Sequence, residues 1–203
     1  MAADKLEQPK TAGAAIGPAA QLQAEVERLK AKLIEAEWKI AELEARADVD
    51  PMLEILNRRG FERELTRSLA YVKRYGAAAA LVYIDLDGFK ATNDKHGHAA
   101  GDALLKAVAH QLTARVRASD VVARLGGDEF AVLLWNLTEA LAITKARDLE
   151  MAIAAVSVSA GAATRVSVGA SAGIVPLAGG TTSDAILDAA DKAMYARKKE
   201  RRG

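Results

Sequence analysis

The sequence predicts an α+β fold, with a central, mainly antiparallel sheet flanked by helices and preceded by a parallel two-stranded coiled-coil helix. Apolar residues recur at alternating spacings of four and three from Leu22 to Ala47, which is a heptad pattern. Beyond Pro51, short apolar runs typical of strands alternate with stretches of helical periodicity. Two of these runs, residues 121–125 and 130–135, flank a four-residue turn that contains glycine, as in a hairpin.

Four regions follow from these patterns along the 203 residues. Residues 1–21 lack periodicity and are expected to be a disordered tail. Residues 22–47 form the heptad helix, and residues 48–51 form a hinge, because Pro51 disfavours helix at the residue before it. Residues 52–203 then form one domain of about 150 residues, a typical single-domain size.

The heptad helix is expected to form a parallel homodimer through Leu22–Ala47. Its a positions include β-branched residues and its d positions are mostly leucine, a combination that favours two strands. The alternative is a single amphipathic helix packed on the domain. Trp38 lies at an outer f position, where it is either tolerated or contacts a partner outside this chain. In an in-register dimer, three pairs of opposite charge face one another, each worth ~0.2–1 kcal/mol: Glu25–Lys30, Lys32–Glu37 and Lys39–Glu44.

The domain's elements are expected in the order β-α-β-β-α-β, between a leading and a trailing helix. This order is that of the ferredoxin-like, split arrangement around one antiparallel sheet. Ser183 can cap the trailing helix through its hydroxyl. The other expected elements are a helix over 57–74, a strand over 78–84, a helix over 100–117, the two hairpin strands, a helix over 138–154 and further strands within 156–175.

Composition excludes several classes of protein. The absence of cysteine excludes a disulfide framework, a thiolate metal site and a cysteine nucleophile. A formal net charge of +1 argues against a dedicated nucleic-acid binder, which usually carries a large basic excess. Apolar runs such as residues 77–84 are too short to span a membrane, and residues 1–20 lack the pattern of a signal peptide. We therefore expect a cytoplasmic protein without a membrane or nucleic-acid partner.

Two clusters of acids are placed to bind a divalent cation. Asp85 and Asp87 end the first predicted strand, and residues two apart on a strand point to the same side. Asp128 and Glu129 follow two glycines in the hairpin turn, which neighbours the first strand in this topology. Carboxylates brought together repel one another, and Mg²⁺ or Mn²⁺ would relieve that repulsion. The alternative is that each cluster is an ordinary solvated turn.

A basic run closes the chain over residues 197–202. Its side chains would either hold a triphosphate beside the metal or only complement the dipole at a helix C-terminus. No aromatic residue is interleaved there for base stacking, which disfavours nucleic-acid binding.

Four blocks of the sequence, in order, resemble the GGDEF family of diguanylate cyclases. Residues 124–130, Arg-Leu-Gly-Gly-Asp-Glu-Phe, resemble the family's signature. Asn57–Phe61 is similar to its opening element, residues 85–102 to its nucleotide site, and Asp191–Arg202 to its closing element. The resemblance extends from about residue 50 to the end of the chain.

The resemblance implies an enzyme that condenses two GTP molecules into cyclic di-GMP and releases two pyrophosphates. Each domain would hold one GTP, and the two domains of a homodimer must face each other for the 3′-hydroxyls to attack. Mg²⁺ or Mn²⁺, two ions per half-site, would be held by Asp85, the Leu86 carbonyl, Asp128 and Glu129. Asp128 and Glu129 are the implied catalytic residues, Asp128 as the proton acceptor. The implied substrate contacts are Asn93 and Asp102 at the guanine edge, His98, Gly126 and Gly127 along the substrate, and Lys90, Lys198 and Arg202 at the phosphates.

The resemblance also implies inhibition by the product. Arg117 and Asp120 match the family's Arg-x-x-Asp inhibitory motif, where cyclic di-GMP would bind; the alternative is an ordinary salt bridge at a helix end. The family's further arginine on the next helix falls at Asp148 here, with Arg147 beside it as a substitute. A second departure is Leu53-Glu54, where the family usually has Thr-Gly.

Two other functions stand beside the active cyclase. One is a catalytically silent module that binds GTP or cyclic di-GMP as a sensor. The other is a structural coiled-coil dimeriser whose domain is a passenger. Degenerate members of the family usually lose motif acids, and this chain retains them, so we expect the active enzyme.

Overall fold

The computed structural model describes residues 18–161 and 164–200. The chain divides into two compact units, with the boundary between Glu44 and Ala45. Within the described residues, no helix is long and apolar enough to cross a lipid bilayer. Of the predicted disordered tail, residues 1–17 lie outside the described residues, whereas residues 18–21 are helical.

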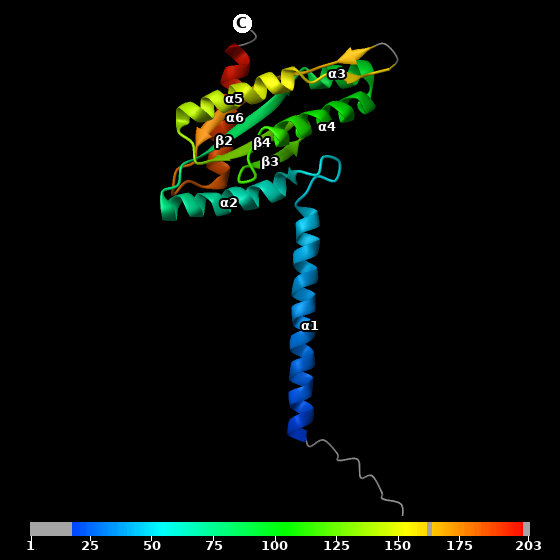
Figure 1. Cartoon of the computed structure of the whole chain (residues 1–203), viewed down its shortest axis with the longest axis vertical. Coiled ribbons are helices and arrows are strands. Elements are labelled where there is room, and N and C mark those ends of the chain that lie inside the picture. Colours follow the sequence, from blue (N-terminus) through cyan, green and yellow to red (C-terminus); the bar gives the residue numbers. More distant parts are fainter. Residues whose placement is uncertain (1–17, 162–163, 201–203) are drawn as a thin grey trace, which may run out of the picture. The chain divides into compact units, whose positions relative to one another are not determined.

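Helix α1, Pro18–Ala47, is one continuous helix that contains the whole predicted heptad segment (Figure 1). The heptad residues stay exposed in the single chain: Leu29 and Leu33, for example, expose 53% and 59% of their surface. Packing against another helix would bury this apolar stripe. The charged residues pair within the helix at a spacing of three, as Glu25–Arg28, Glu27–Lys30 and Lys39–Glu42.

The second unit is built on a five-stranded sheet in the order β1–β3–β4–β2–β7. Every neighbouring pair is antiparallel except β1 and β3. Apart from β1, this is the predicted ferredoxin-like arrangement, so the α+β fold with a mainly antiparallel sheet is confirmed. The strands are β1 Leu56–Asn57, β2 Ala79–Asp87, β3 Val121–Gly126, β4 Glu129–Trp135 and β7 Gly169–Pro176, with a separate ribbon of β5 Val158–Ser159 and β6 Arg165–Val166.

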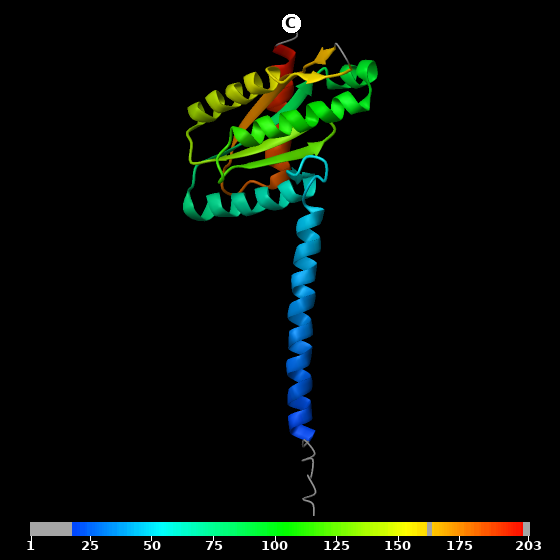
Figure 2. The same cartoon turned by 45° about the vertical axis from the view of Figure 1, so that its right-hand side comes forward.

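Helices cover both faces of this sheet (Figure 2). Because side chains alternate across a strand, β2 sends Val82 and Ile84 to one core and Leu81 and Tyr83 to the other. The first core lies under α4 and α5, and the second under α2 and α6. The helices are α2 Arg58–Tyr75, α3 Phe89–His96, α4 His98–Ala114, α5 Glu139–Ala154 and α6 Ser183–Glu200.

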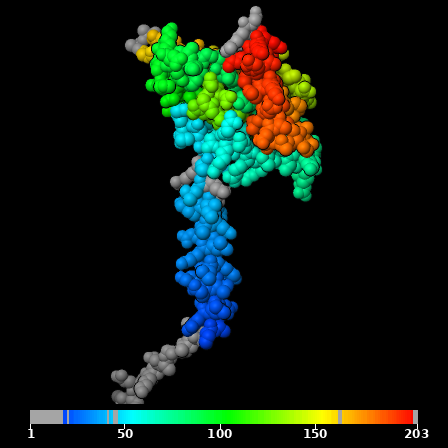
Figure 3. Space-filling view, turned by 180° about the vertical axis from the view of Figure 1, so that it is seen from behind, coloured from blue at the N-terminus to red at the C-terminus, as the bar shows by residue number. Residues whose placement is uncertain are grey.

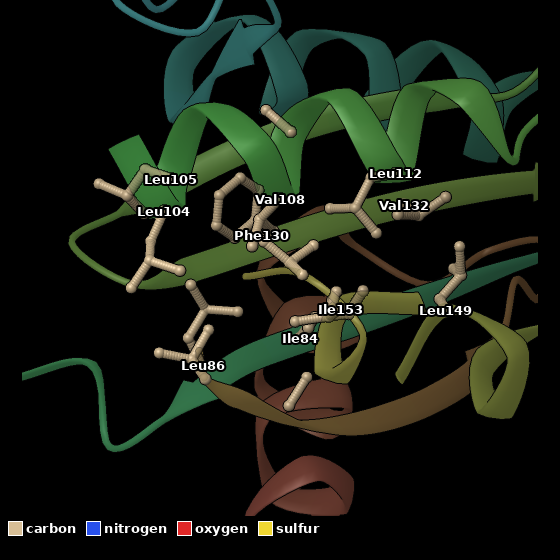
Figure 4. Packing of buried hydrophobic residues seen from close by; sticks show 14 of the residues in the cluster. Ile84, Leu86, Leu104, Leu105, Val108, Leu112, Phe130, Val132, Leu149 and Ile153 are labelled. Atoms are coloured by element: carbon tan, nitrogen blue, oxygen red, sulfur yellow. The ribbon is translucent and has the colours of Figure 1, made fainter. Parts of the chain in front are cut away.

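Figure 4 shows the core beneath α4 and α5. Leu104 and Val108 of α4 and Ile153 of α5 pack over the sheet residues Ile84 and Phe130. All five side chains are fully buried. Since burial of apolar surface is the main stabilising term in folding, this core holds the ends of β2 and β4 in a defined register.

Two segments near the acids differ from the prediction. Strand β2 continues to Asp87, three residues beyond the predicted end at Ile84, so the acids lie within the sheet. Helix α3 follows at once and was not predicted, because only Phe89 of its eight residues is buried and no apolar periodicity marks it. Helix α4 begins at His98 and ends at Ala114, whereas the predicted helix spanned residues 100–117.

Residues at two helix starts also refine the prediction. The Thr182 hydroxyl, and not that of Ser183, accepts from the backbone N–H of Ala185 (3.3 Å) at the start of α6. Ser183 is instead hydrogen-bonded to Thr66 of α2 (2.8 Å). At the start of α2, the Asn57 side chain accepts from the backbone N–H three residues on (3.0 Å), which caps that helix.

Glu54 has a backbone φ of 57°, in the left-handed region that favours glycine. This is the position where the resembled family has glycine. The chain therefore keeps the turn before α2 although it lacks the residue best suited to that turn.

Candidate functional site

The acids of β2 lie at its carboxyl end, and by the alternation of the strand they share the sheet face of Leu81 and Tyr83, which α6 covers. Figure 3 shows the side of the domain on which α6, in orange and red, lies at the surface. The ammonium of Lys198 is paired with Asp85 and lies 3.7 Å from Oδ1 of Asp87. Asp87 Oδ2 also accepts a hydrogen bond from the buried Ser171 hydroxyl (3.0 Å). Both carboxylates therefore face one cation, as the alternation of the strand predicts.

The Gly126–Glu129 turn is held by an arginine of its own hairpin. Arg124 donates from Nε (3.1 Å) and Nη2 (2.8 Å) to the Gly127 carbonyl, and its Nη1 lies 3.1 Å from Oδ2 of Asp50. Gly127 has φ 47°, which favours glycine at this position. The segment before α2 and the turn are thus joined through one guanidinium group.

Backbone pairing places this turn beside β2. Asp85 and Glu129 are direct partners across the β2–β4 ladder, and the Leu86 N–H donates to the Asp128 carbonyl (3.1 Å). The Glu129 carboxylate lies 3.5 Å from Nη2 of Arg58, at the start of α2. The backbones of the four residues expected to ligate metal therefore adjoin at one edge of the sheet.

The electrostatics of the site disfavour further negative charge. Burial raises the pKa of Asp85, and the neighbouring carboxylates, including Asp128, raise it further, against the opposing effect of Lys198. Burial also raises the pKa of Tyr83, and the nearby Glu129 carboxylate raises it further. A bound cation would relieve this repulsion.

The donor set at this edge fits a hard divalent cation. Asp85, Asp128 and Glu129 supply carboxylates, and the Leu86 carbonyl is on the same side of the strand as its own N–H, toward the turn. All are oxygen donors, which Mg²⁺ and Mn²⁺ prefer. The contact of Lys198 with two carboxylates also indicates that this position accepts a positive charge.

The arrangement of these donors differs from the prediction. Across residues 18–161 and 164–200, no three acids or histidines gather closely enough to hold an ion. The three or four carboxylates expected to meet are therefore not gathered here as a metal ion would need them, and their role as ligands stays a prediction. The physical reason is that Lys198 draws Asp85 toward α6, whereas Arg58 draws Glu129 toward α2.

The predicted guanine contacts lie where α3 meets α4. Asn93 Oδ1 is buried and has no hydrogen-bond partner within the described residues. A side chain at Gly101 would collide with the Asn93 amide, so glycine is needed for these helices to pack. Asp102 and His98 lie exposed on the first turns of α4. One polar group of Asn93 thus still lacks a partner.

The predicted phosphate contacts are spread more widely. Lys90 is exposed on α3, and Gly126 and Gly127 are exposed at the turn. Lys198 is only 17% exposed. Arg202 lies outside the described residues. The exposed lysine and the two bare glycines leave room for a ligand beside the acids.

Sequence reasoning missed three groups that support the site. Arg58 belongs to the opening element, but its pairing with Glu129 depends on a distant strand. Ser171 is a buried hydroxyl on β7 without any local signal. Asp50 was assigned only to the hinge, yet its carboxylate pairs with Arg124. The only local signals for this pair were the positions of Asp50 before a proline and of Arg124 shortly before the two glycines of the turn.

Of the three predicted inhibitory residues, Arg117 and Asp120 lie together, whereas Arg147 lies apart from them. Asp120 accepts from the backbone N–H of Arg117 (2.9 Å) and of Trp135 (3.0 Å), so its carboxylate closes a turn and does not form the alternative salt bridge with Arg117. Arg117 and Asp120 line a hollow of about 230 Å³, to which Lys145 and Asp148 also contribute. Arg147 instead lines a hollow between α5 and α6, away from the other two.

Comparisons with known proteins agree with this architecture. The family model described as "Diguanylate cyclase, GGDEF domain" matches residues 47–203. Diguanylate cyclase TpbB of Pseudomonas aeruginosa is 38% identical over 165 residues, which are 80% of this chain and 38% of that protein. The chain thus spans well under half the length of this curated relative.

Solved structures are similar to the chain as well. The crystal structure of a sensory box/GGDEF family protein from Caulobacter crescentus CB15 gives a TM-score of 0.69 at 35% identity, over 75% of this chain and 99% of that one. The coiled coil and GGDEF domain of DgcB from Caulobacter crescentus, crystallised with c-di-GMP, gives 0.74 at 24% identity, over 88% of this chain and 95% of that one. At 24% identity, the second likeness concerns the fold alone.

Proposed function

The chain belongs to the GGDEF-domain family, and on that premise we propose that it is a diguanylate cyclase, which condenses two GTP molecules into cyclic di-GMP. The observation that carries the proposal is the pairing of Asp85 with Glu129 across two strands, beside Lys198. Acids and a lysine at the open end of a sheet fit a role in binding a metal–nucleotide complex better than a role in core packing.

In the proposed reaction, the 3′-oxygen of one GTP attacks the α-phosphorus of the other. The bond from that phosphorus to the oxygen of the β-phosphate breaks, pyrophosphate leaves, and the hydroxyl proton passes to Asp128. The reciprocal attack by the 3′-oxygen of the second nucleotide closes the ring and releases the second pyrophosphate. Mg²⁺ or Mn²⁺, two ions per half-site held by Asp85, the Leu86 carbonyl, Asp128 and Glu129, would stabilise charge on the phosphates. Lys198, Lys90 and Arg202 neutralise the remaining phosphate charge.

Guanine recognition is proposed for Asn93 and Asp102, with His98 lining the same site. The buried Oδ1 of Asn93 that lacks a partner supports this role, because a buried polar atom is costly until it is paired. An incorrect base would leave such groups unpaired, which is a strong basis for selectivity.

Dimerisation through Leu22–Ala47 is proposed to bring two domains together. The exposure of Leu29 and Leu33 in the single chain supports it, since a coil would bury both. Tethering raises the local concentration of the second domain to about millimolar. Replacing both leucines with glutamine should give a monomer with little activity, measured by sedimentation and by pyrophosphate release. Full activity of that variant at nanomolar protein would contradict the proposed dimer.

Product inhibition is proposed at the hollow that Arg117 and Asp120 line. The Arg117 guanidinium suits phosphate and base contacts of a dinucleotide. Arg147 is separated from this hollow, and Lys145 is the cation that lines it beside Arg117. Arg117→Ala should therefore relieve inhibition by added cyclic di-GMP without lowering the initial rate.

Incubation with GTP and Mg²⁺ tests the activity, with pyrophosphate and cyclic dinucleotide as the readouts. Asp128→Ala and Glu129→Ala should abolish both products. Asp188→Ala removes an exposed acid of α6 and is the matched control. A parent that binds GTP without turnover would favour the silent sensor, and undiminished variants would overturn the assigned site.

A further inference from the structure

An ion pair between a buried glutamate and a half-buried arginine joins the two helices beside β7. Glu150 of α5 exposes only 8% of its side chain. Its Oε1 accepts from the backbone N–H of Ala172 (2.9 Å) and from Nε of Arg197 (3.3 Å), and its Oε2 accepts from Nη2 of Arg197 (3.4 Å). A buried carboxylate is unfavourable unless it is paired and hydrogen-bonded, so these contacts hold both side chains in one arrangement.

The Glu150 carboxylate satisfies a backbone N–H group at the free edge of the sheet. Strand β7 is an edge strand, and Glu150 supplies the acceptor for Ala172. Arg197 reaches the same carboxylate from α6, which covers the opposite face of the sheet from α5. One carboxylate therefore fastens α5, β7 and α6 to one another.

The last turn of α6 follows the buried residues that pack this helix on the sheet. The helix lies directly on β7 at Gly173, where a side chain would collide with the backbone of Ala190 and Met194. Met194 is the last buried apolar residue of α6 within its described range, which ends at Glu200. Beyond it, Arg197 and Lys198 form ion pairs with Glu150 of α5 and Asp85 of β2.

We propose that Glu150 and Arg197 are a positioning pair for Lys198, an inference that rests on the proposed function. Successive helical residues project about 100° apart, so holding Arg197 toward α5 directs Lys198 toward Asp85. Without the pair, the end of α6 frays and the ammonium leaves the acids that it faces. Arg197 acts on the reaction through Lys198 and does not touch substrate.

A double-mutant cycle with Arg197→Gln and Lys198→Ala tests this role. Its readouts are kcat/KM for GTP and the affinity for a GTP analogue with a methylene bridge between the α- and β-phosphorus atoms. Arg197→Gln should lower kcat/KM about tenfold, with no further loss in a protein that already carries Lys198→Ala. Arg197→Lys should restore part of the loss, because it keeps a cation beside Glu150.

Lys192→Gln removes an exposed pair on the same helix and is the matched control, with unchanged kcat/KM expected. Losses that add across the cycle, or a fully active Arg197→Gln, would overturn the positioning role. If the wild type binds the analogue but forms no cyclic di-GMP, the proposed function is wrong, and analogue affinity alone decides the positioning role. Should Arg197→Gln fail to fold, Glu150→Gln replaces it, because its amide oxygen still accepts from Ala172.

Discussion

Neighbouring residues of α6 form ion pairs with opposite consequences. Lys198 contacts Asp85 at the open end of β2, whereas Arg197 contacts Glu150 beneath α5. Both carboxylates are largely buried, with 16% and 8% of their side chains exposed, so burial does not distinguish them. What differs is the rest of each surrounding: Glu150 has a backbone N–H and a two-point arginine contact, whereas Asp85 has other carboxylates near it.

This difference indicates which pair is available for chemistry. An acid with a raised pKa beside other acids is stabilised by any added cation, so Lys198 can share Asp85 with a metal. An acid whose lone pairs are already bonded gains little from a ligand and serves to hold helices. The Lys198–Asp85 pair therefore belongs to the candidate site, whereas the Arg197–Glu150 pair holds the helices around it.

The largest expected effect is on the Asp85 side of the comparison. Asp85→Asn should lower the rate of pyrophosphate release by about 100-fold or more, because it removes a charged metal ligand without changing the shape. The unfolding free energy should not fall, since burial disfavours the charged form of this acid. Asp188→Asn is the exposed control, and a loss of less than tenfold in Asp85→Asn would contradict the assignment.

Glu150 should respond in the opposite sense. Glu150→Ala leaves Arg197 and the Ala172 N–H without their acceptor, and should lower the unfolding free energy by about 2 kcal/mol in urea denaturation. Its effect on turnover should be smaller than that of Asp85→Asn. A variant as stable as the wild type would show that the Glu150–Arg197 pair does not stabilise the packing of α5 and α6 on the edge strand β7.

The pH dependence of stability sharpens the contrast. Because burial raises the pKa of Asp85 in the folded protein, the folded state keeps this proton over an interval in which the unfolded chain releases it. The contribution of Asp85 to stability is therefore full below the ordinary aspartate pKa and falls as pH rises through the raised pKa. The difference in unfolding free energy between the wild type and Asp85→Asn should decline across that interval. If the difference in unfolding free energy grew with pH instead, the result would contradict a raised pKa of Asp85 in the folded protein.

The smallest effect is expected for the third pair of α6, Lys192 with Asp188. Both side chains are more than 60% exposed, so solvent and salt screen their attraction. Lys192→Gln should change neither turnover nor the urea midpoint measurably. A clear loss of stability would mean that the exposure of an ion pair does not indicate how much it contributes to the unfolding free energy.

Local signals predicted most of the helices. The helices predicted over 57–74 and 138–154 are found at Arg58–Tyr75 and Glu139–Ala154, because apolar periodicity and the caps Asn57 and Thr138 mark them. Helix α3 and strand β1 escaped prediction, since eight and two residues are too few for a periodic pattern. Neither omission changes the order of the main strands.

The candidate site was predicted unevenly for a related reason. The acids of β2 and the turn were identifiable from their spacing, and strand pairing does place Asp85 opposite Glu129. The pairing of these acids with cations was not predicted: Lys198 was expected at the phosphates and Arg58 had no assigned role. Both approach from helices, 113 and 71 positions away in the chain from their partners. These two cations also turn the Asp85 and Glu129 side chains toward different helices, an arrangement that strand spacing alone does not predict.

By itself, the sequence determined the alternation of the elements, the heptad stripe and the residue types at each strand end, since these depend on periodicity and local chemistry. Only the tertiary structure decided which cation faces which acid, that Arg147 lies apart from Arg117, and that Glu150 closes the edge of β7. The physical reason is that a side-chain pair across the sheet depends on helix packing, which no short stretch of sequence encodes. The path from Arg197 to Lys198 therefore becomes visible only in the folded chain.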